Sequence, residues 1–161
     1  MGLVLRPATQ LDAALLWEWR NEEVTRLNSF DTAPIQWSSH VGWLEQKLAS
    51  SACRIWILEA EGRSVGQIRF ERHGDTAVVN YSIDAHYRGR GLGTAILNLA
   101  VGQACTELGV HDIAGVARIS NVPSCRAFAA AGFRRVADFI EAGDSFARFE
   151  RTCGRPVEIP A

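Results

Sequence analysis

Apolar residues recur along the chain with two periods, and these periods predict most of the secondary structure. Short runs of β-branched and aromatic residues between glycine, proline and polar residues are typical of strands. Apolar residues spaced three and four positions apart are typical of helices. The predicted strands cover residues 3–5, 54–60, 64–71, 77–83, 112–119, 133–139 and 145–152, and the predicted helices end near residues 21, 48, 108 and 132.

Polar residues ahead of the first two helices support this assignment. Thr9 and Asp12 have the spacing of a capping box for the first helix. Ser38 or Ser39 is expected to cap the second helix, because a hydroxyl accepts a hydrogen bond from a free backbone N–H. Residues 22–37, between these helices, are expected to form a loop with a single helical turn.

Length and composition favour one globular domain. The chain has 161 residues, and we expect the domain to cover residues 1–152 and a tail to cover residues 153–161. Its apolar content of 47% and charged content of 22% are typical of a globular protein. A net charge of −1 gives no reason to expect nucleic-acid binding, and no apolar run is long enough to span a membrane. We therefore expect a cytoplasmic protein.

The four cysteines are Cys53, Cys105, Cys125 and Cys153. They have no C-x-x-C spacing and no paired framework, so neither a metal site nor a disulfide is predicted. We expect all four to be reduced thiols, as is usual in cytosolic proteins.

A glycine-rich loop, containing Gly89, Gly91 and Gly93, joins the strand over residues 77–83 to the third helix. A strand, a glycine loop and a helix start together gather free backbone N–H groups at the positive end of the helix dipole, which favours phosphate binding. The loop lacks the Gly-Lys-Ser/Thr of a nucleotide P-loop and the G-x-G-x-x-G of a dinucleotide site. The alternative is a glycine-rich turn that only joins two elements.

Two motifs resemble those of a known family. The first, R-x-x-G-x-G, begins at Arg88, and the second, N-V-P-S-x-x-x-F-x-x-x-G-F, runs from Asn121 to Phe133. With the order of the elements, they resemble the GNAT superfamily of N-acetyltransferases, which use acetyl-coenzyme A (acetyl-CoA). The resemblance implies an α/β fold with a mixed, mostly antiparallel sheet, splayed fourth and fifth strands, and helices on both faces.

The resemblance also implies which residues hold the cofactor. In the family, main-chain groups of the strand hold the pantetheine arm, the glycine loop holds the pyrophosphate, and the second motif lies near the thiol. Asn121 has an alternative role as the cap of the helix that follows it. The expected cofactor-binding residues are Ser82, Ile83, Arg88, Gly89, Arg90, Gly91, Leu92, Gly93, Thr94, Asn121, Ser124 and Phe128.

The chain departs from the family pattern at Phe128, where many members carry a tyrosine that protonates the departing thiolate. Phenylalanine has no proton to give, so Tyr81 and Ser124 are the expected catalytic alternatives, with Tyr87 as a further candidate for the acid. A thiol with a pKa near 8.5 leaves without strong acid help. His40 is the candidate general base because imidazole titrates near neutral pH, although a lone helical histidine is more often a surface or core residue.

The N-terminal region resembles acetyltransferases that act on the 4-amino group of UDP-linked amino-deoxy sugars in pseudaminic-acid-type polysaccharide pathways. Four of the five tryptophans lie within residues 17–43, where they either cover one end of the sheet or form a wall for a sugar or uracil ring. The expected acceptor-binding residues are Arg20, Asn21, His40, Trp43, Arg69 and Asn80.

Two other functions compete with the sugar acetyltransferase. GNAT members that acetylate protein N-termini, as on ribosomal proteins, share part of the N-terminal pattern. A non-catalytic module that binds acyl-CoA is the interpretation that Phe128 favours. The sequence leaves the oligomeric state open, a homodimer included.

Overall fold

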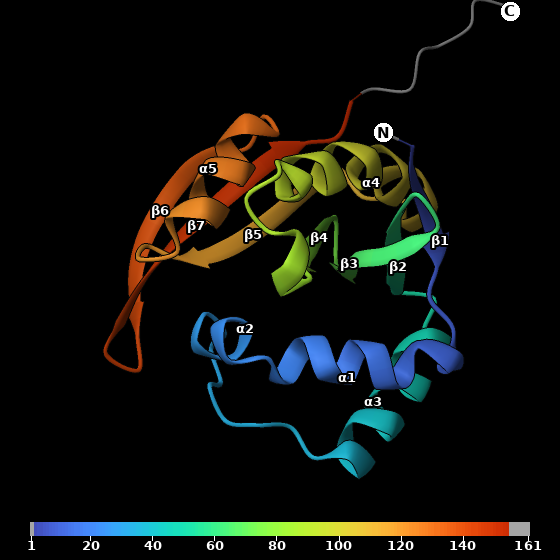
Figure 1. Cartoon of the computed structure of the whole chain (residues 1–161). Coiled ribbons are helices and arrows are strands. Elements are labelled where there is room, and N and C mark those ends of the chain that lie inside the picture. The colour runs from blue at the N-terminus through green and yellow to red at the C-terminus, as the bar shows by residue number, and fades with distance from the viewer. Residues whose placement is uncertain (1, 155–161) are drawn as a thin grey trace, which may run out of the picture.

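The computed structural model describes residues 2–154 and shows a seven-stranded sheet with helices on both faces (Figure 1). The strand order is β1-β2-β3-β4-β5-β7-β6, with β4 and β5 parallel and every other pair antiparallel. The expected fold class is therefore confirmed. The strands are β1 Leu3–Pro7, β2 Cys53–Ala60, β3 Arg63–His73, β4 Thr76–Ile83, β5 Asp112–Arg118, β6 Arg134–Glu141 and β7 Asp144–Thr152. The helices are α1 Ala13–Asn21, α2 Glu23–Leu27, α3 Trp37–Ala49, α4 Leu92–Leu108 and α5 Val122–Ala130, with short 3-10 turns at Gln10–Asp12 and Ala85–Tyr87.

Alternation along the strands divides the core into two layers. On β2, Trp56 and Leu58 belong to the larger core, which also contains buried residues of α4 and α5. Ile55 and Ile57, one position out of step, belong to a second core with residues of α1 and α3. Because successive strand side chains point to opposite faces, an unbroken apolar run on β2 fills both layers.

Strands β4 and β5 pair over four positions and then diverge. Their register runs from Thr76 opposite Asp112 to Val79 opposite Gly115. Beyond this point β4 continues to pair only with β3, while β5 pairs with β7 as far as Arg118. We call this point of divergence the fork. It leaves main-chain groups of β4 without a neighbouring strand on the β5 side.

Gly115 allows an aromatic ring to pack against the backbone at the fork. A Cβ atom on Gly115 would lie 2.5 Å from two ring atoms of Phe128 and 3.2 Å from a methyl carbon of Val79. The Phe128 ring stacks on Phe149 and meets Phe133 edge-on, with centroid separations of 5.1 Å in both cases. The Phe128 ring of α5 therefore fills the space at the place where the two strands separate.

The ends of α1 and α3 test the capping predictions. The Thr9–Asp12 capping box is present, at the 3-10 turn that leads into α1. The prediction that Ser38 or Ser39 caps the second helix is wrong, because α3 begins at Trp37 with Gln36 as its cap residue. The backbone N–H of His40 already donates to the Gln36 carbonyl oxygen at 3.0 Å, so both serines lie inside the first turn.

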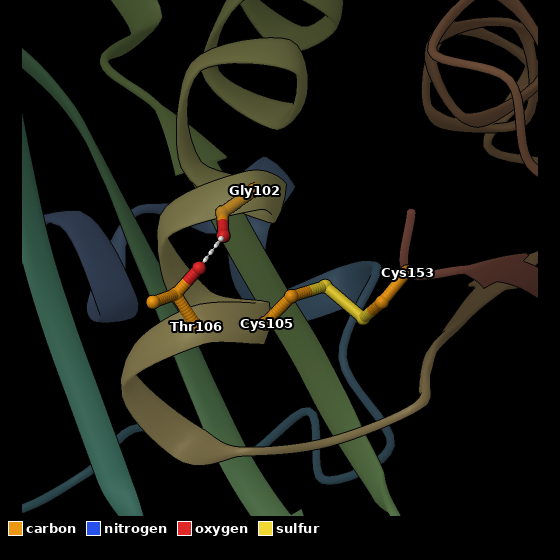
Figure 2. Close-up of a disulfide and its surroundings, with 4 residues drawn as sticks. All are labelled: Gly102, Cys105, Thr106 and Cys153. Carbon is orange, nitrogen blue, oxygen red and sulfur yellow. Dashed lines mark hydrogen bonds between the residues drawn. A yellow bond between two sulfur atoms is a disulfide. The ribbon is translucent and has the colours of Figure 1, made fainter. Parts of the chain in front are cut away.

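The prediction that all four cysteines are reduced is wrong for one pair. Cys105 of α4 and Cys153, which follows β7, form a disulfide with their Cα atoms 5.9 Å apart (Figure 2). Their sequence separation of 48 residues gave no signal of pairing, whereas the packing of α4 beside the end of β7 brings them within disulfide range. Cys53 and Cys125 are free thiols. Residues 155–161 of the expected tail lie outside the described residues.

Residues 2–154 contain neither a membrane-spanning helix nor a cluster of metal ligands. No helix there is long and apolar enough to cross a membrane. No group of three or more histidine, cysteine or acidic residues in the same range is arranged to hold a metal ion.

Reduction of the disulfide is expected to lower the melting temperature. In the chain-entropy account, a cross-link that closes a loop of this length stabilises the fold by about 4 kcal/mol. Dithiothreitol should therefore lower the Tm of the wild type and leave the Tm of Cys105→Ser unchanged. Cys125→Ser serves as the control and should keep the response to dithiothreitol. Equal Tm values with and without the reductant would contradict the disulfide.

Substitution of Gly115 is expected to destabilise the protein through the Phe128 ring. Gly115→Ala overpacks the fork and should reduce the free energy of unfolding by about 1–3 kcal/mol or more. Gly102→Ala is the matched control: it lies inside α4 with open space around its Cβ position, so the helix propensity of alanine should make it neutral or stabilising. Denaturant unfolding measures the effect in both variants, in Phe128→Leu, and in Gly115→Ala combined with Phe128→Leu. Strictly additive losses in the double variant would contradict the proposed contact.

Candidate functional site

The glycine loop forms the start of α4. Gly89 and Gly91 have φ values of 75° and 76°, a left-handed conformation that side chains rarely adopt. Gly91 is the N-cap residue of α4 and provides no side-chain cap, so the first-turn N–H groups of this 17-residue helix are not capped by a side chain. Such N–H groups, together with the helix dipole, suit a phosphate.

Several residues expected at the cofactor have other contacts in the structure. Leu92 is only 4% exposed and belongs to the core, so its main chain is the part that could face a ligand. The Asn121 side-chain oxygen accepts a hydrogen bond from the Ser124 N–H at 3.3 Å, which is the capping role. Phe128 is 2% exposed and packs at the fork. The Ser82 hydroxyl accepts from the Gln67 side chain at 3.2 Å. Cofactor contacts of these residues stay predictions.

Arg88 forms an ion pair with an acidic residue from another part of the chain. Its Nη2 atom donates to Glu22 Oε2 at 2.8 Å and to Thr25 Oγ1 at 3.1 Å, and its Nε atom donates to the Ile83 carbonyl oxygen at 3.1 Å. The Arg88 hydrogen bond is the main cause that lowers the pKa of Glu22 to about 2. The charge that the sequence assigned to the phosphate site is thus partly neutralised.

A cavity of about 490 Å³ lies beside the glycine loop. Arg63, His86 and Arg90 supply its basic groups, and Glu61 is its acidic one. The Arg90 guanidinium lies 5.3 Å from the centre of the Tyr87 ring and donates to the His86 carbonyl oxygen. The basic groups next to the helix start extend the region that suits phosphate.

Tyr81 and Ser124 lie together on the α4 and α5 side of the sheet. Their hydroxyl oxygens are 3.1 Å apart, which is a hydrogen bond. The Tyr81 ring also meets Phe128 edge-on, with centroids 5.7 Å apart, and a Cβ atom on Gly93 would lie 3.3 Å from it. Burial raises the pKa of Tyr81, so the phenol is protonated at neutral pH. The structure thus brings together two of the three predicted catalytic residues and places a phenol beside Phe128.

A second cavity, of about 390 Å³, lies between α1, α3 and the opposite face of the sheet. We call it the N-terminal cavity. It contains four of the six residues expected at the acceptor. Its lining residues are Leu16, Arg20, Ile35, Ser39, His40, Trp43, Ile55, Gln67 and Arg69.

Two arginines give the N-terminal cavity a positive charge. Burial lowers the pKa of both Arg20 and Arg69, which means that their charge is poorly solvated there. Arg20 donates from Nη2 to the Asp31 carbonyl oxygen at 3.0 Å, but its buried Nη1 atom has no partner within residues 2–154. Arg69 lies 4.9 Å from the centre of the Trp43 ring and 3.4 Å from a carboxylate oxygen of Glu71. No acidic residue is among the described residues that line this cavity.

His40 lies in the wall of the N-terminal cavity as a neutral imidazole. Its Nε2 atom is 3.0 Å from the Ala13 carbonyl oxygen, and a carbonyl can only accept, so Nε2 carries the proton. Burial is the main cause that lowers the pKa of His40, which is only 4% exposed. The basic lone pair is therefore on Nδ1, and the centre of the imidazole ring lies 6.2 Å from that of Trp37 and 5.8 Å from that of Trp43.

The two asparagines expected at the acceptor do not line the N-terminal cavity. Asn21 holds the main chain of Ile35, since its Oδ1 accepts from the N–H at 2.7 Å and its Nδ2 donates to the carbonyl at 2.9 Å. Asn80 accepts from Gln67 at 3.1 Å, and Gln67 itself lines the cavity. Sequence reasoning missed Gln67, although its alternation with Ile68 on β3 places it on the same face as Arg69.

The tryptophan cluster is divided between packing and the N-terminal cavity. Trp43 lines the cavity, whereas Trp17 and Trp37 pack edge-on with centroids 5.4 Å apart. Trp19 is 7% exposed and donates from Nε1 to Asp84 Oδ2 at 2.8 Å. Most of the cluster therefore serves the structure of the N-terminal helices.

Comparison with known proteins gives a family match. A family model described as acetyltransferase (GNAT) domain matches residues 2–134. No curated protein matches the sequence significantly.

Solved structures share the fold at low sequence identity. The aminoglycoside acetyltransferase AAC(6')-Ib, in complex with paromomycin and acetyl-CoA, is 20% identical with a TM-score of 0.81, over 94% of this chain and 94% of that one. Spermidine N-acetyltransferase from Vibrio cholerae, in complex with CoA and spermine, is 17% identical with a TM-score of 0.83, over 93% and 95%. An acetyltransferase of the GNAT family from Streptococcus pneumoniae is 15% identical with a TM-score of 0.76, over 95% and 100%.

Proposed function

The chain belongs to the GNAT acetyltransferases, as an acetyl-CoA-dependent N-acetyltransferase that acts on amines, and we propose that its acceptor amine is carried by an anionic molecule. The observation that carries the proposal is the charge of the N-terminal cavity. Arg20 and Arg69 point their charge at a space without an acidic lining residue. Arg69 has a counter-ion in Glu71, whereas the buried Nη1 atom of Arg20 has no partner within residues 2–154. A buried charged group with an unpartnered donor is costly, and an anionic ligand removes that cost.

The proposed acceptor differs in charge from those of the structural neighbours. Paromomycin and spermine, which those structures contain, are polycations at neutral pH, and a polycation is attracted by carboxylates. In this chain, the carboxylate nearest to Arg69 is that of Glu71, which also pairs with Lys47 at 2.8 Å. The fold is shared, but the charge in the N-terminal cavity favours a different class of amine.

Within this class we propose a UDP-linked amino-deoxy sugar, acetylated on its 4-amino group. Its diphosphate would take the two guanidinium groups, which bind phosphate oxygens through charge-assisted and often bidentate hydrogen bonds. Trp43 offers an aromatic face to a pyranose or uracil ring. Protein N-termini and a non-catalytic acyl-CoA-binding role are the alternatives that the experiment below separates.

The residues at the glycine loop fit acetyl-CoA. The cofactor supplies the acetyl group as a thioester, and the N–H groups at the start of α4, with Arg90 and Arg63 near them, would hold its phosphates. The unpaired main chain of β4 beyond the fork would hold the pantetheine arm. We assign the proton donor for the thiolate to Tyr81, supported by Ser124, because the phenol is protonated and adjoins Phe128.

On the acceptor side, His40 is the proposed base. Because its Nε2 proton is committed to Ala13, the Nδ1 atom is the one that can accept a proton from the amine. The lowered pKa keeps this nitrogen free of a proton at neutral pH. Gln67 of β3 lines the N-terminal cavity and donates hydrogen bonds to Asn80 and Ser82 of the neighbouring strand β4. Polar side chains therefore extend from the cavity to the part of β4 beyond the fork.

Arg20→Ala is expected to weaken the acceptor selectively. Loss of a charge-assisted hydrogen bond of about 1.5–3 kcal/mol should raise the KM of the UDP-4-amino sugar by ten- to a hundredfold. The KM of acetyl-CoA should stay within about twofold, because Arg20 lies on the opposite face from the glycine loop. Steady-state kinetics that follow free thiol measure both values. Arg134→Ala, on the exposed strand β6, is the control and should match the wild type.

Inhibition by UDP separates the alternatives in the same assay. UDP should compete with the acceptor and not with acetyl-CoA. If UDP does not compete at millimolar concentration and a peptide N-terminus is acetylated efficiently, the protein N-terminal alternative is correct. If no amine is acetylated while CoA still binds, the chain is a non-catalytic binding module.

Tyr81→Phe is expected to lower turnover without weakening acetyl-CoA. A general acid contributes up to 10²–10⁴-fold, and a thiolate needs less help than a stronger base, so we expect a fall in kcat of about 10–100-fold. Tyr87→Phe tests the other tyrosine of the chain, which the sequence also offered as the acid. Because Tyr87 lies beside Arg90 at the glycine loop and not beside Phe128, we expect this variant to keep the wild-type kcat. Because the pKa of Tyr81 is raised, wild-type kcat should not fall on the alkaline side before the ordinary tyrosine range near pH 10. An unchanged kcat in Tyr81→Phe would remove Tyr81 from the mechanism.

A further inference from the structure

Helix α2 is attached to the sheet on both sides of the fork. Near its start, Arg88 donates from Nη2 to Glu22 Oε2 at 2.8 Å and to Thr25 Oγ1 at 3.1 Å. Beyond its end, Arg118 donates from Nη2 to the Ser29 carbonyl oxygen at 2.8 Å. Arg88 lies after β4 and Arg118 ends β5, so the segment that contains α2 bridges the two strands that diverge at the fork.

Glu22 is the centre of the attachment on the β4 side. Its carboxylate accepts from the N–H groups of Val24 at 3.2 Å and Thr25 at 3.0 Å, which caps α2, and from Arg88 at the same time. It directly follows α1, whose last turn carries Arg20. A movement of the Arg88 guanidinium would therefore act on the junction between α2 and α1, and α1 lines the N-terminal cavity through Leu16 and Arg20.

A second contact joins the same two regions. Trp19 of α1 donates to Asp84 Oδ2 at 2.8 Å, and Asp84 Oδ1 accepts from the N–H of His86 at 2.8 Å. The α1–α2 junction is thus fixed to residues 84–88, which lead directly into the glycine loop.

Arg88 is oriented by two of its three nitrogens. Nε is held by the Ile83 carbonyl oxygen and Nη2 by Glu22, whereas Nη1 has no hydrogen-bond partner within the described part of the chain. The Nη2 atom is therefore committed to Glu22 and Thr25 at the start of α2, whereas Nη1 keeps its capacity to donate to an anion.

We propose that Glu22 is a positioning residue that couples binding at the glycine loop to helices α1 and α2, with Arg88 as the connecting side chain. A coupling between two sites requires a contact that differs between the free and the bound state. A pyrophosphate on Nη1 changes the position of Arg88, and the charge-assisted bond to Glu22 passes this change to the α1–α2 junction. The proposal concerns how the sites communicate, and it holds whichever amine is the acceptor.

Hydrogen exchange with CoA as the probe tests the coupling without an acceptor. In the wild type, saturating CoA should slow amide exchange both in residues 86–98 and in residues 20–30. In Glu22→Gln, protection of residues 86–98 should persist, while the CoA-dependent protection of residues 20–30 should fall by about half or more. Glutamine keeps an oxygen that can cap α2, so the helix is expected to form in the variant. The difference between CoA-bound and free protein is the readout, and a merely structural role would change exchange without CoA instead.

Glu23→Gln is the matched control. It removes the same charge one residue further along, from an exposed side chain, and should behave as the wild type. Thr25→Val removes the second acceptor of Arg88 and should give an intermediate loss. The proposal is overturned if residues 20–30 of the wild type show no response to CoA, or if Glu22→Gln keeps the full response. Absence of protection at residues 86–98 would instead contradict cofactor binding at the glycine loop.

Discussion

The contact between Phe128 and Gly115 is the constraint that sets the geometry of the fork and of the groups around it. Gly115 is the last residue of β5 that pairs with β4, and the Phe128 ring occupies the place of a side chain at that position. Because protein interiors are close-packed, a ring at this point prevents the two strands from continuing side by side. Beyond the fork, the main chain of β4 has no neighbouring strand on the β5 side. Tyr81 lies there, beside Phe128, and its hydroxyl is hydrogen-bonded to that of Ser124. A phenylalanine here thus shapes the fork, and the proposed proton donor, Tyr81, lies on the neighbouring strand β4.

The sheet separates two kinds of electrostatic environment. On the α4 side, the positive groups are backbone N–H groups and exposed arginines, which suit phosphate. Water already solvates and screens these groups, so keeping them there without a ligand costs little free energy. On the α1 and α3 side, Arg20 and Arg69 are partly desolvated, and burial lowers the pKa of each. A guanidinium in that situation gains more from an anionic partner than one in water does. We therefore propose that charge selects the ligand in the N-terminal cavity, whereas backbone geometry selects it at the glycine loop.

Local sequence signals predicted much of the fold but little of the N-terminal cavity. The Thr9–Asp12 capping box, the strand boundaries and the glycine loop could all be predicted, because each depends on residues within a few positions of one another. Arg20, His40, Trp43 and Arg69 were expected at the acceptor by resemblance, and they do line one cavity. The predictions of a reduced Cys105 and Cys153 and of a serine cap for α3 were wrong, since neither feature follows from local preference. The disulfide depends on how α4 passes β7, and the start of α3 depends on which carbonyl accepts from His40.

What could not be predicted are polar contacts between distant segments. Arg88 and Glu22 are 66 residues apart, and Arg118 and Ser29 are 89 apart, so neither pair leaves a trace in periodicity or motif. An arginine in a phosphate-binding motif is expected to face phosphate, and its occupation by Glu22 becomes visible only in the folded chain. The same contact places a negative charge near a site for an anion, which lowers the attraction for phosphate. Anion binding benefits from the Glu22 contact only if the fixed orientation of Arg88 contributes more to binding than the neutralised charge takes away. Because this orientation depends on Glu22, the glycine loop is linked to the junction of α1 and α2.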